Sequence, residues 1–235
     1  GWLMMISRPD LAESVGVAKS FTNDYRPEHV RYVKHIVRYL AGHIDYGLRF
    51  NLSTSPKQPA AGKLKMFVDS NFAVRGSNSE DEGYVRATSG GVAMYNGAAV
   101  AWWSQKQGRT TRSSTDSEIV GLDEGARRAL WLRQIAMDMG IEGVETFEVF
   151  EDNAQAEGFA MDTKVPKRTK YINTRYHATR DDVRFGDIKV SKVSSADNIS
   201  DIMTKPLKPF HFRRLRTLMG VMPCTLHARE SRAGS

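Results

Sequence analysis

The sequence predicts a mixed α/β fold, in which helices cover the faces of a sheet of antiparallel and parallel strands. Two short apolar runs flank Asn96-Gly97, and this dipeptide is a strong signal for a β-hairpin. Residues 113–139 then form a long amphipathic stretch, and two more short strands alternate with helical segments after it. Hairpin strands run antiparallel and strands joined through helices run parallel, so the sheet should contain both kinds.

The N-terminal part of the chain is predicted to be helical over residues 9–49. Within residues 28–40, apolar side chains recur every three or four positions and form one stripe along a helix. Gly42 indicates where that helix ends. Residues 51–63 are rich in proline and serine, which predicts a linker between this part and the sheet.

The elements of the sheet region follow in chain order. We expect strands at residues 64–69, 90–95, 98–103, 147–152 and 188–193. We expect helices at residues 113–139, from Ala154 onward, at 199–204 and at 210–219. The last helix is basic, and its polar face is predicted to expose Arg213, Arg214 and Arg216 to solvent or to nucleic acid.

The composition of the 235 residues is that of a folded globular protein, with 40% hydrophobic and 26% charged side chains. No apolar run approaches the roughly 20 residues that span a bilayer, so we expect no membrane helix. Cys224 is the only cysteine, which excludes an intrachain disulfide and a cysteine-based zinc site. These features predict an intracellular protein in a reducing compartment.

The net charge of +7 is concentrated in the C-terminal third of the chain. Residues 161–235 hold 16 basic and 7 acidic side chains, whereas the rest of the chain is slightly acidic. This distribution favours a polyanionic partner, most often nucleic acid, although incidental charge on a solvated surface would give the same pattern.

Four acidic residues on four separate elements are the candidate site residues. Asp69 and Asp152 each end a predicted strand, and if these strands are parallel neighbours both acids lie at the same sheet edge. Glu118 lies near the start of the long helix and Asp201 in the short helix at residues 199–204. Carboxylate ligands suit Mg²⁺ or Mn²⁺, and two such ions about 4 Å apart support phosphodiester hydrolysis.

Each of these acids also has a structural explanation. Glu118 fits a capping box with Thr115, and Asp152 could cap the helix that follows it. Asp69 could begin a turn, and Asp201 could be a solvated helix residue. Spacing alone does not show that the four acids converge.

Short blocks of residues run in a fixed order through residues 67–218. They are Val68-Asp69-Ser70-Asn71-Phe72, Thr88-Ser89-Gly90-Gly91-Val92, Trp103-Ser104-Gln105-Lys106-Gln107, Ser113-Ser114-Thr115-Asp116-Ser117-Glu118, Ala129-Leu130-Trp131-Leu132-Arg133, Glu151-Asp152-Asn153, Arg168-Thr169-Lys170, Arg175-Tyr176-His177 and Asp201-Ile202-Met203-Thr204-Lys205-Pro206-Leu207. In this order and spacing the blocks resemble the ribonuclease H domain of the Pol polyprotein of copia-type LTR retrotransposons. Residues 8–10, 38–42 and 45–48 resemble the end of the reverse transcriptase of the same polyprotein.

The resemblance implies a ribonuclease H-like fold with a five-stranded mixed sheet, preceded by a small helical segment. It divides the chain into a reverse transcriptase tail (1–50), a linker (51–63), the ribonuclease H domain (64–221) and a loose tail (222–235). It implies metal-dependent cleavage of the RNA strand of RNA/DNA hybrids, with two Mg²⁺ or Mn²⁺ ions. The catalytic, metal-binding acids would be Asp69, Glu118, Asp152 and Asp201. The implied partners are the hybrid and the reverse transcriptase part, in the cytoplasm within virus-like particles or in the nucleus.

The residues expected to hold nucleic acid form two groups. Side chains and amide groups at the start of the long helix could bind a phosphate, and these residues are Arg109, Arg112, Ser113, Ser114 and Thr115. The second group combines a basic strip with Asn153, which follows the acid Asp152. The residues of the strip are Lys167, Arg168, Lys170 and Arg175. Phosphate contacts would make binding sensitive to salt, and the 2′-hydroxyl would distinguish RNA from DNA.

The sequence departs from the family pattern at three positions. Asn71 stands where the family usually has a second aspartate, and Tyr171 and Asn173 stand where it usually has His and Asp. These departures leave open a decayed or repurposed module that binds hybrid without cutting it. A third hypothesis is a segment that acts only when joined to the polymerase part, because the apolar stripe of residues 28–40 needs a partner.

Overall fold

The computed structural model describes residues 1–23, 26–51, 63–72, 86–108, 110–142, 144–161 and 177–224. The strands are β1 (Tyr46–Leu48), β2 (Lys65–Asn71), β3 (Thr88–Tyr95), β4 (Ala98–Lys106), β5 (Phe147–Glu151), β6 (Ile188–Lys192) and β7 (Val221–Pro223). The helices are α1 (Trp2–Ile6), the 3₁₀ helix η1 (Pro9–Leu11), α2 (Ala12–Ser20), α3 (Pro27–Ala41), α4 (Ser114–Asp138), α5 (Ala154–Met161), α6 (Ala178–Phe185), α7 (Asp201–Thr204) and α8 (Pro209–Leu218).

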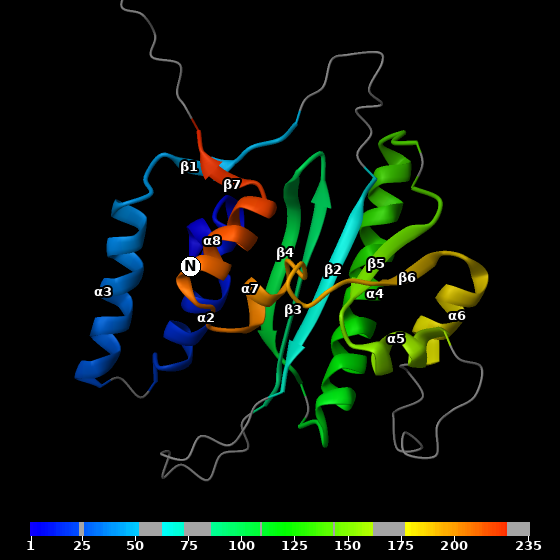
Figure 1. Cartoon of the computed structure of the whole chain (residues 1–235), viewed down its shortest axis with the longest axis horizontal. Coiled ribbons are helices and arrows are strands. Elements are labelled where there is room, and N and C mark those ends of the chain that lie inside the picture. The colour runs from blue at the N-terminus through cyan, green and yellow to red at the C-terminus, as the bar shows by residue number, and fades with distance from the viewer. Residues whose placement is uncertain are drawn as a thin grey trace, which may run out of the picture.

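The main sheet has five strands in the order β4-β3-β2-β5-β6 (Figure 1). β2, β3 and β4 pair antiparallel, whereas β2 pairs with β5, and β5 with β6, in parallel. This is the five-stranded mixed sheet of a ribonuclease H-like fold, so the predicted fold class is confirmed. The sheet forms because the hairpin supplies the antiparallel strands and the helical connections supply the parallel ones.

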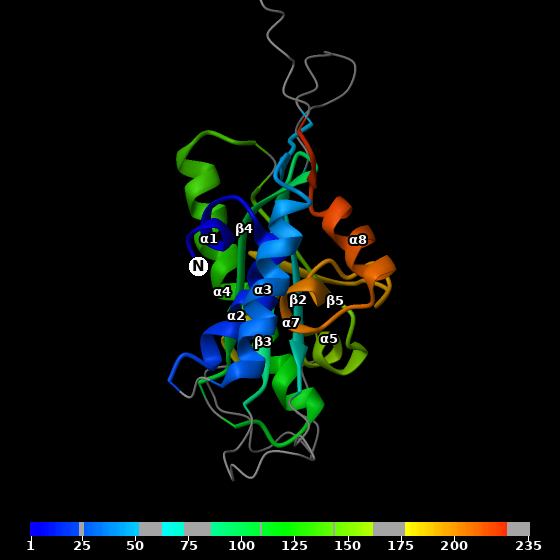
Figure 2. The same cartoon turned by 90° about the vertical axis from the view of Figure 1, so that its left-hand side faces the viewer.

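Helices cover both faces of the sheet. Figure 1 shows α4, α5 and α6 on one side of the strands and α2, α3, α7 and α8 on the other, and Figure 2 shows the second group from its outer side. Among the described residues, no helix combines the length and the apolar character needed to cross a membrane.

The alternation of side chains along the strands supplies a separate core to each face. On β2, Met66 and Val68 join the core beneath α4 and α5, while Phe67 packs against the opposite core. On β3, Ala93 joins the core beneath α4 and α5, and Val92 joins the opposite core. Strand residues point to alternate faces, so both layers of helices are held by the same two strands.

The β3–β4 hairpin turns at the predicted dipeptide. Asn96 has a φ of 49° and Gly97 a φ of 81°, the left-handed conformation that a two-residue hairpin turn requires. Asparagine and glycine adopt it at the lowest cost, which explains why the local sequence was sufficient to predict the hairpin.

The N-terminal segment is part of the same structure and is not purely helical. Tyr46–Leu48, predicted to be helical, instead forms β1 and pairs with β7. The indole nitrogen of Trp102 on β4 donates a hydrogen bond to the carbonyl oxygen of Met4 in α1, at 2.7 Å. β7 also includes Met222 and Pro223, which lie in the segment expected to be a loose tail. Residues far apart in the sequence therefore build this edge together.

A buried polar network joins the N-terminal helices to α8. Arg8 binds both carboxylate oxygens of Asp10, at 3.0 and 2.8 Å, and the Tyr39 hydroxyl donates to Asp10 Oδ2 at 2.6 Å. Arg216 then donates to the Tyr39 oxygen at 3.0 Å and lies over the ring of Tyr46. The prediction that Arg216 is exposed is therefore wrong: it is buried because residues from α3 and β1 provide partners for its charge.

Helix α6 was not predicted from the sequence. Its eight residues carry mostly charged and polar side chains, so they show only a short apolar pattern. The helix ends at Gly186, whose φ of 82° is the left-handed conformation typical of a helix C-cap.

Candidate active site

Strand register places two of the predicted acids side by side. Phe67 of β2 pairs with Phe150 of the parallel strand β5. Asp69 and Asp152 each lie two residues further along, so they are level with one another at the same edge. This is the arrangement that the sequence predicted from two parallel neighbouring strands.

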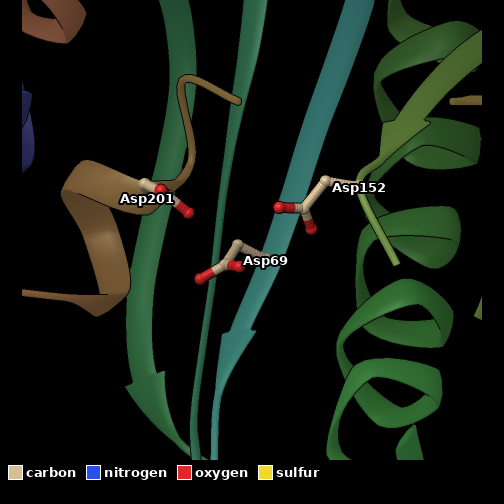
Figure 3. Close-up of side chains that lie close together, drawn as sticks. All are labelled: Asp69, Asp152 and Asp201. Carbon is tan, nitrogen blue, oxygen red and sulfur yellow. The ribbon is translucent and has the colours of Figure 1, made fainter. Parts of the chain in front are cut away.

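A third acid approaches from the opposite side. Asp201 begins α7, and one carboxylate oxygen each from Asp69, Asp152 and Asp201 lie within 4.8 Å of one another. Figure 3 shows the three carboxylates, from β2, from the end of β5 and from α7, pointing toward a common space. Asp69 is only 1% exposed and Asp201 only 7%.

Residues without side chains allow the elements to approach this closely. A Cβ on Gly90 of β3 would lie 2.5 Å from the Cβ of Met203, so glycine lets α7 lie against the sheet. A Cβ on Gly121 of α4 would lie 2.2 Å from Ser70 Oγ. The loop before α7 is held by Asn198, whose side-chain amide donates to the carbonyl oxygen of Val68 at 3.0 Å.

Glu118 lies beside this group but is not part of the three-carboxylate cluster. Its Oε2 accepts a hydrogen bond from the backbone amide of Ser70 at 3.0 Å. Burial raises the pKa of Glu118 to about 9, and the carboxylates of Asp69 and Asp152 add to the rise. Glu118 does not close a capping box with Thr115, because Ser113 caps α4 by accepting from the amide of Asp116.

The raised pKa of Glu118 predicts how stability depends on pH. The folded protein keeps a proton on Glu118 up to a pKa of about 9, whereas the unfolded chain releases it near 4.5. Stability of the metal-free protein should therefore fall as pH rises between these values. Replacing Glu118→Gln removes the charge and should stabilise the metal-free protein at pH 8 by at least about 1 kcal/mol.

Urea unfolding in EDTA at pH 6 and pH 8 measures this effect. The Glu118→Gln protein should lose less stability between the two pH values than the parent. The matched control is the exposed Glu142→Gln, which should behave like the parent. A Glu118→Gln protein that is less stable than the parent at pH 8 would contradict the prediction.

A lysine bridges two of the clustered acids. Lys205 Nζ lies 2.9 Å from Asp69 Oδ1 and 2.8 Å from Asp201 Oδ1, and the Thr204 hydroxyl donates to Asp69 Oδ2. Burial raises the pKa of Asp69, and the ammonium group of Lys205 offsets part of that rise. His211 on α8 is also near, with Nε2 3.8 Å from Asp201 Oδ2. The cluster thus has a lysine and a histidine as neighbours on the α7–α8 side.

A cleft of about 950 Å³ opens beside the cluster, between α2–α3 and α7–α8. Its lining includes Tyr32, Tyr39, Phe212 and Arg213, and Lys205 belongs to it as well. Lys205 is therefore the point at which the cleft meets the acids.

The sequence is similar to several known proteins. The sequence is 29% identical over 220 residues to the retrovirus-related Pol polyprotein from transposon TNT 1-94 of Nicotiana tabacum, a match that covers 94% of this chain and 16% of that protein. It is 27% identical over 218 residues to the polyprotein from transposon RE1 of Arabidopsis thaliana, covering 93% of this chain and 14% of that protein. It is also 36% identical over 131 residues to secreted RxLR effector protein 161 of Plasmopara viticola, covering 56% of this chain and 84% of that protein.

The homologues that cover most of this chain are copia-type retrotransposon Pol polyproteins. It spans about a sixth of the length of the Pol polyprotein from transposon TNT 1-94. No protein-family model matches it.

Solved structures similar to this chain include ribonuclease H domains. The N-terminal RNase H domain of a Mycobacterium tuberculosis protein is 18% identical with a TM-score of 0.42, covering 65% of this chain and 95% of that chain. A foamy viral protease–reverse transcriptase in complex with RNA/DNA hybrid is 14% identical with a TM-score of 0.40, covering 65% of this chain and 21% of that chain. Both TM-scores are below 0.5. The fold of this chain is therefore assigned from the order and the directions of its five strands.

The nucleic-acid contacts expected from the sequence remain predictions. Five of them, Arg109, Lys167, Arg168, Lys170 and Arg175, lie outside the described residues, as do Tyr171 and Asn173. The others lie at the start of α4 and α5, namely Arg112, Ser113, Ser114, Thr115 and Asn153. Two of these have structural roles: the Ser113 hydroxyl caps α4, and Asn153 Oδ1 caps α5 by accepting from the amides of residues 155 and 156. Asn153, and not Asp152, is therefore the cap of α5.

Asn71, which departs from the family pattern, and His177, which belongs to one of the matching blocks, both have structural contacts. The Asn71 side chain donates to the carbonyl oxygen of Thr204 at 3.2 Å, and so ties the end of β2 to α7. His177 lies against the ring of Phe159 and near Arg180, on the α5–α6 side of the sheet. Neither belongs to the acid cluster.

Sequence reasoning missed two residues of this site. Lys205 lies four positions after Asp201, a spacing that brings side chains together on a helix and could have indicated the pair. Glu151 is fully buried behind the cluster, and its inward position follows from its alternation with Phe147 and Val149 on β5. Burial raises the pKa of Glu151 well above its ordinary value, and Glu118 adds to the rise.

Proposed function

We propose that this chain is a nuclease that cleaves the RNA strand of RNA/DNA hybrids during reverse transcription of a retrotransposon. The observation that carries the proposal is the convergence of Asp69, Asp152 and Asp201 in a chain of the copia-type Pol family. Buried carboxylates repel one another and cost free energy unless positive charge compensates them. A function that brings a cation to this point explains why they lie together.

The donor set of the cluster fits a hard divalent cation. Its three carboxylates offer only oxygen ligands within a space 4.8 Å across, and no histidine or cysteine belongs to the group among the described residues. Mg²⁺ and Mn²⁺ prefer such ligands. Asp69, Asp152 and Asp201 would hold the metal, which when bound neutralises charge on a phosphate and activates water.

The protein's own residues then set the geometry of the reaction. Thr204 and Lys205 fix the carboxylate of Asp69, and the Ser70 amide fixes that of Glu118. A site held in this way needs little rearrangement when substrate binds. We propose Asp69, Glu118, Asp152 and Asp201 as the catalytic residues, with Glu118 acting from the edge of the cluster.

The substrate and the partners follow from charge and from the family. The excess of basic side chains in residues 161–235 supplies contacts to phosphate. We propose that residues 64–221 form the nuclease domain and residues 1–50 continue from a reverse transcriptase part that delivers the hybrid. The compartment would be the one where reverse transcription takes place, the cytoplasm within virus-like particles or the nucleus.

Strand choice is the property that tests this proposal. In a hybrid with different dyes on its RNA and DNA strands, and with Mg²⁺ present, the RNA strand should be cut and the DNA strand left intact. Duplex DNA of the same sequence is the matched control and should not be cut, because it lacks the 2′-hydroxyl. Equal cutting of both strands would contradict the proposal. Binding of the hybrid without cutting would instead favour a module that has lost its chemistry.

A further inference from the structure

The position of Lys205 bears on how many metal ions the site can hold. We propose that the ammonium group of Lys205 occupies one of the two cation positions in the acid cluster. The chain would then bind one divalent ion, whereas the family resemblance implies two. This inference rests on the proposed metal-dependent function and specifies how its site is filled.

The contacts of Lys205 are those of a bridging cation. Its Nζ lies at 2.9 Å from Asp69 Oδ1 and 2.8 Å from Asp201 Oδ1, which are distances of strong charge-assisted hydrogen bonds. A divalent ion that bridged the same two oxygens would need to lie about 2.1 Å from each. The ammonium group and such an ion therefore cannot both occupy the space between Asp69 and Asp201.

The backbone holds Lys205 at this place. Its amide donates to the carbonyl oxygen of Asp201 at 3.0 Å, and Pro206 follows it at the end of α7. Met203, in the same short helix, is fully buried against β3. The lysine stem therefore starts from a fixed point close to both acids, and the two ion pairs must offset only the freedom of the side chain itself.

The charges of the cluster balance with a single divalent ion. Three clustered carboxylates and one ammonium group leave two negative charges, which one divalent ion neutralises. Two divalent ions together with the lysine would leave an excess of positive charge in a largely buried space, which is unfavourable. No hydrogen bond or ion pair joins Asp152 to Lys205 among the described residues. The Asp152 carboxylate therefore remains available to the single ion, together with Asp201 Oδ2, which Lys205 does not bind.

The ammonium group is also within reach of a substrate. The Lys205 side chain is 33% exposed and lines the cleft between α3 and α8. A phosphate that approached the acids from the cleft would therefore meet a fixed positive charge beside the metal. In this role Lys205 would stabilise charge on the phosphate that a second ion would otherwise stabilise.

Counting bound Mn²⁺ by equilibrium dialysis, with titration calorimetry beside it, tests the proposal. The parent chain should bind one ion, and Lys205→Met should bind one more than the parent. Lys205→Arg, which keeps the charge, should bind the same number as the parent. Lys189→Met is the matched control, because Lys189 lies on β6 and pairs only with Glu148 among the described residues.

The possible outcomes separate this inference from the proposed function. Two ions in the parent, or equal numbers in the parent and a folded Lys205→Met protein, would overturn the inference and leave metal-dependent cleavage standing. No bound Mn²⁺ in either protein would overturn both. Circular dichroism reports whether Lys205→Met is folded. If it is not, the parent decides: one ion supports the inference and two overturn it.

Discussion

The substitution Asp69→Asn should lower the rate of hybrid cleavage by at least about 10³-fold. Asp69 is the central acid of the cluster, flanked by Asp152, which directly follows β5, and by Asp201 on α7. Asparagine keeps the shape of the side chain but removes the charge that attracts a divalent ion. Metal ions contribute several kcal/mol to transition-state stabilisation, and each 1.36 kcal/mol corresponds to a factor of ten in rate.

The measurement is the initial rate of hybrid cleavage at saturating Mg²⁺, with circular dichroism to show that the variant is folded. Asp138→Asn is the matched control, since it removes the same charge from the exposed C-terminal end of α4. That variant should retain the parent rate within about twofold. A folded Asp69→Asn protein that cuts at the parent rate would remove the acid cluster from the mechanism.

The substitution Arg8→Ala should lower the free energy of unfolding of the whole protein by about 3–5 kcal/mol. Arg8 and Asp10 are 4% and 2% exposed, and the substitution leaves the Asp10 carboxylate buried without its guanidinium partner. The same network includes Tyr39 and Arg216, so the loss should spread to α3 and α8. The N-terminal segment and the main sheet should therefore unfold as one unit.

Urea unfolding followed by tryptophan fluorescence measures the loss, because Trp102 and Trp103 lie on β4 of the main sheet. Arg214→Ala is the control, since Arg214 forms an exposed ion pair with Asp197 on the same side of the molecule. Exposed pairs contribute about 0–1 kcal/mol. An Arg8→Ala protein as stable as the parent, or one that unfolds in two separate transitions, would show that the N-terminal segment is an independent part.

Local sequence signals were sufficient where an element depends on its own residues. The hairpin follows from Asn96-Gly97, and the helix predicted at 113–139 is observed as Ser114–Asp138 because its N-cap and its terminating Gly140 are local. The position of β1 was not predictable in this way. Its three residues form a strand only because β7, from the other end of the chain, pairs with them.

The candidate site was predictable only where its residues follow from the order and direction of the strands. Strand order and direction placed Asp69 and Asp152 at one edge, but the approach of Asp201 depends on how α7 packs over Gly90. The ion pair of Lys205 with Asp69, and the hydrogen bond of Arg216 to Tyr39 of α3, join positions more than 130 apart in the sequence. Such pairs depend on tertiary packing, which spacing in one sequence does not reveal.

Metal-dependent cleavage of a hybrid that carries a 5′-labelled RNA strand tests the central claim most directly. The parent and Asp152→Asn would each be assayed with Mg²⁺, with Mn²⁺ and with EDTA, and hybrid binding would be measured in parallel. We predict cutting by the parent with metal, none with EDTA, and a loss of cutting in Asp152→Asn while hybrid binding persists. A parent chain that binds the hybrid but does not cut it with either metal would contradict the account, as would cutting that continues in EDTA.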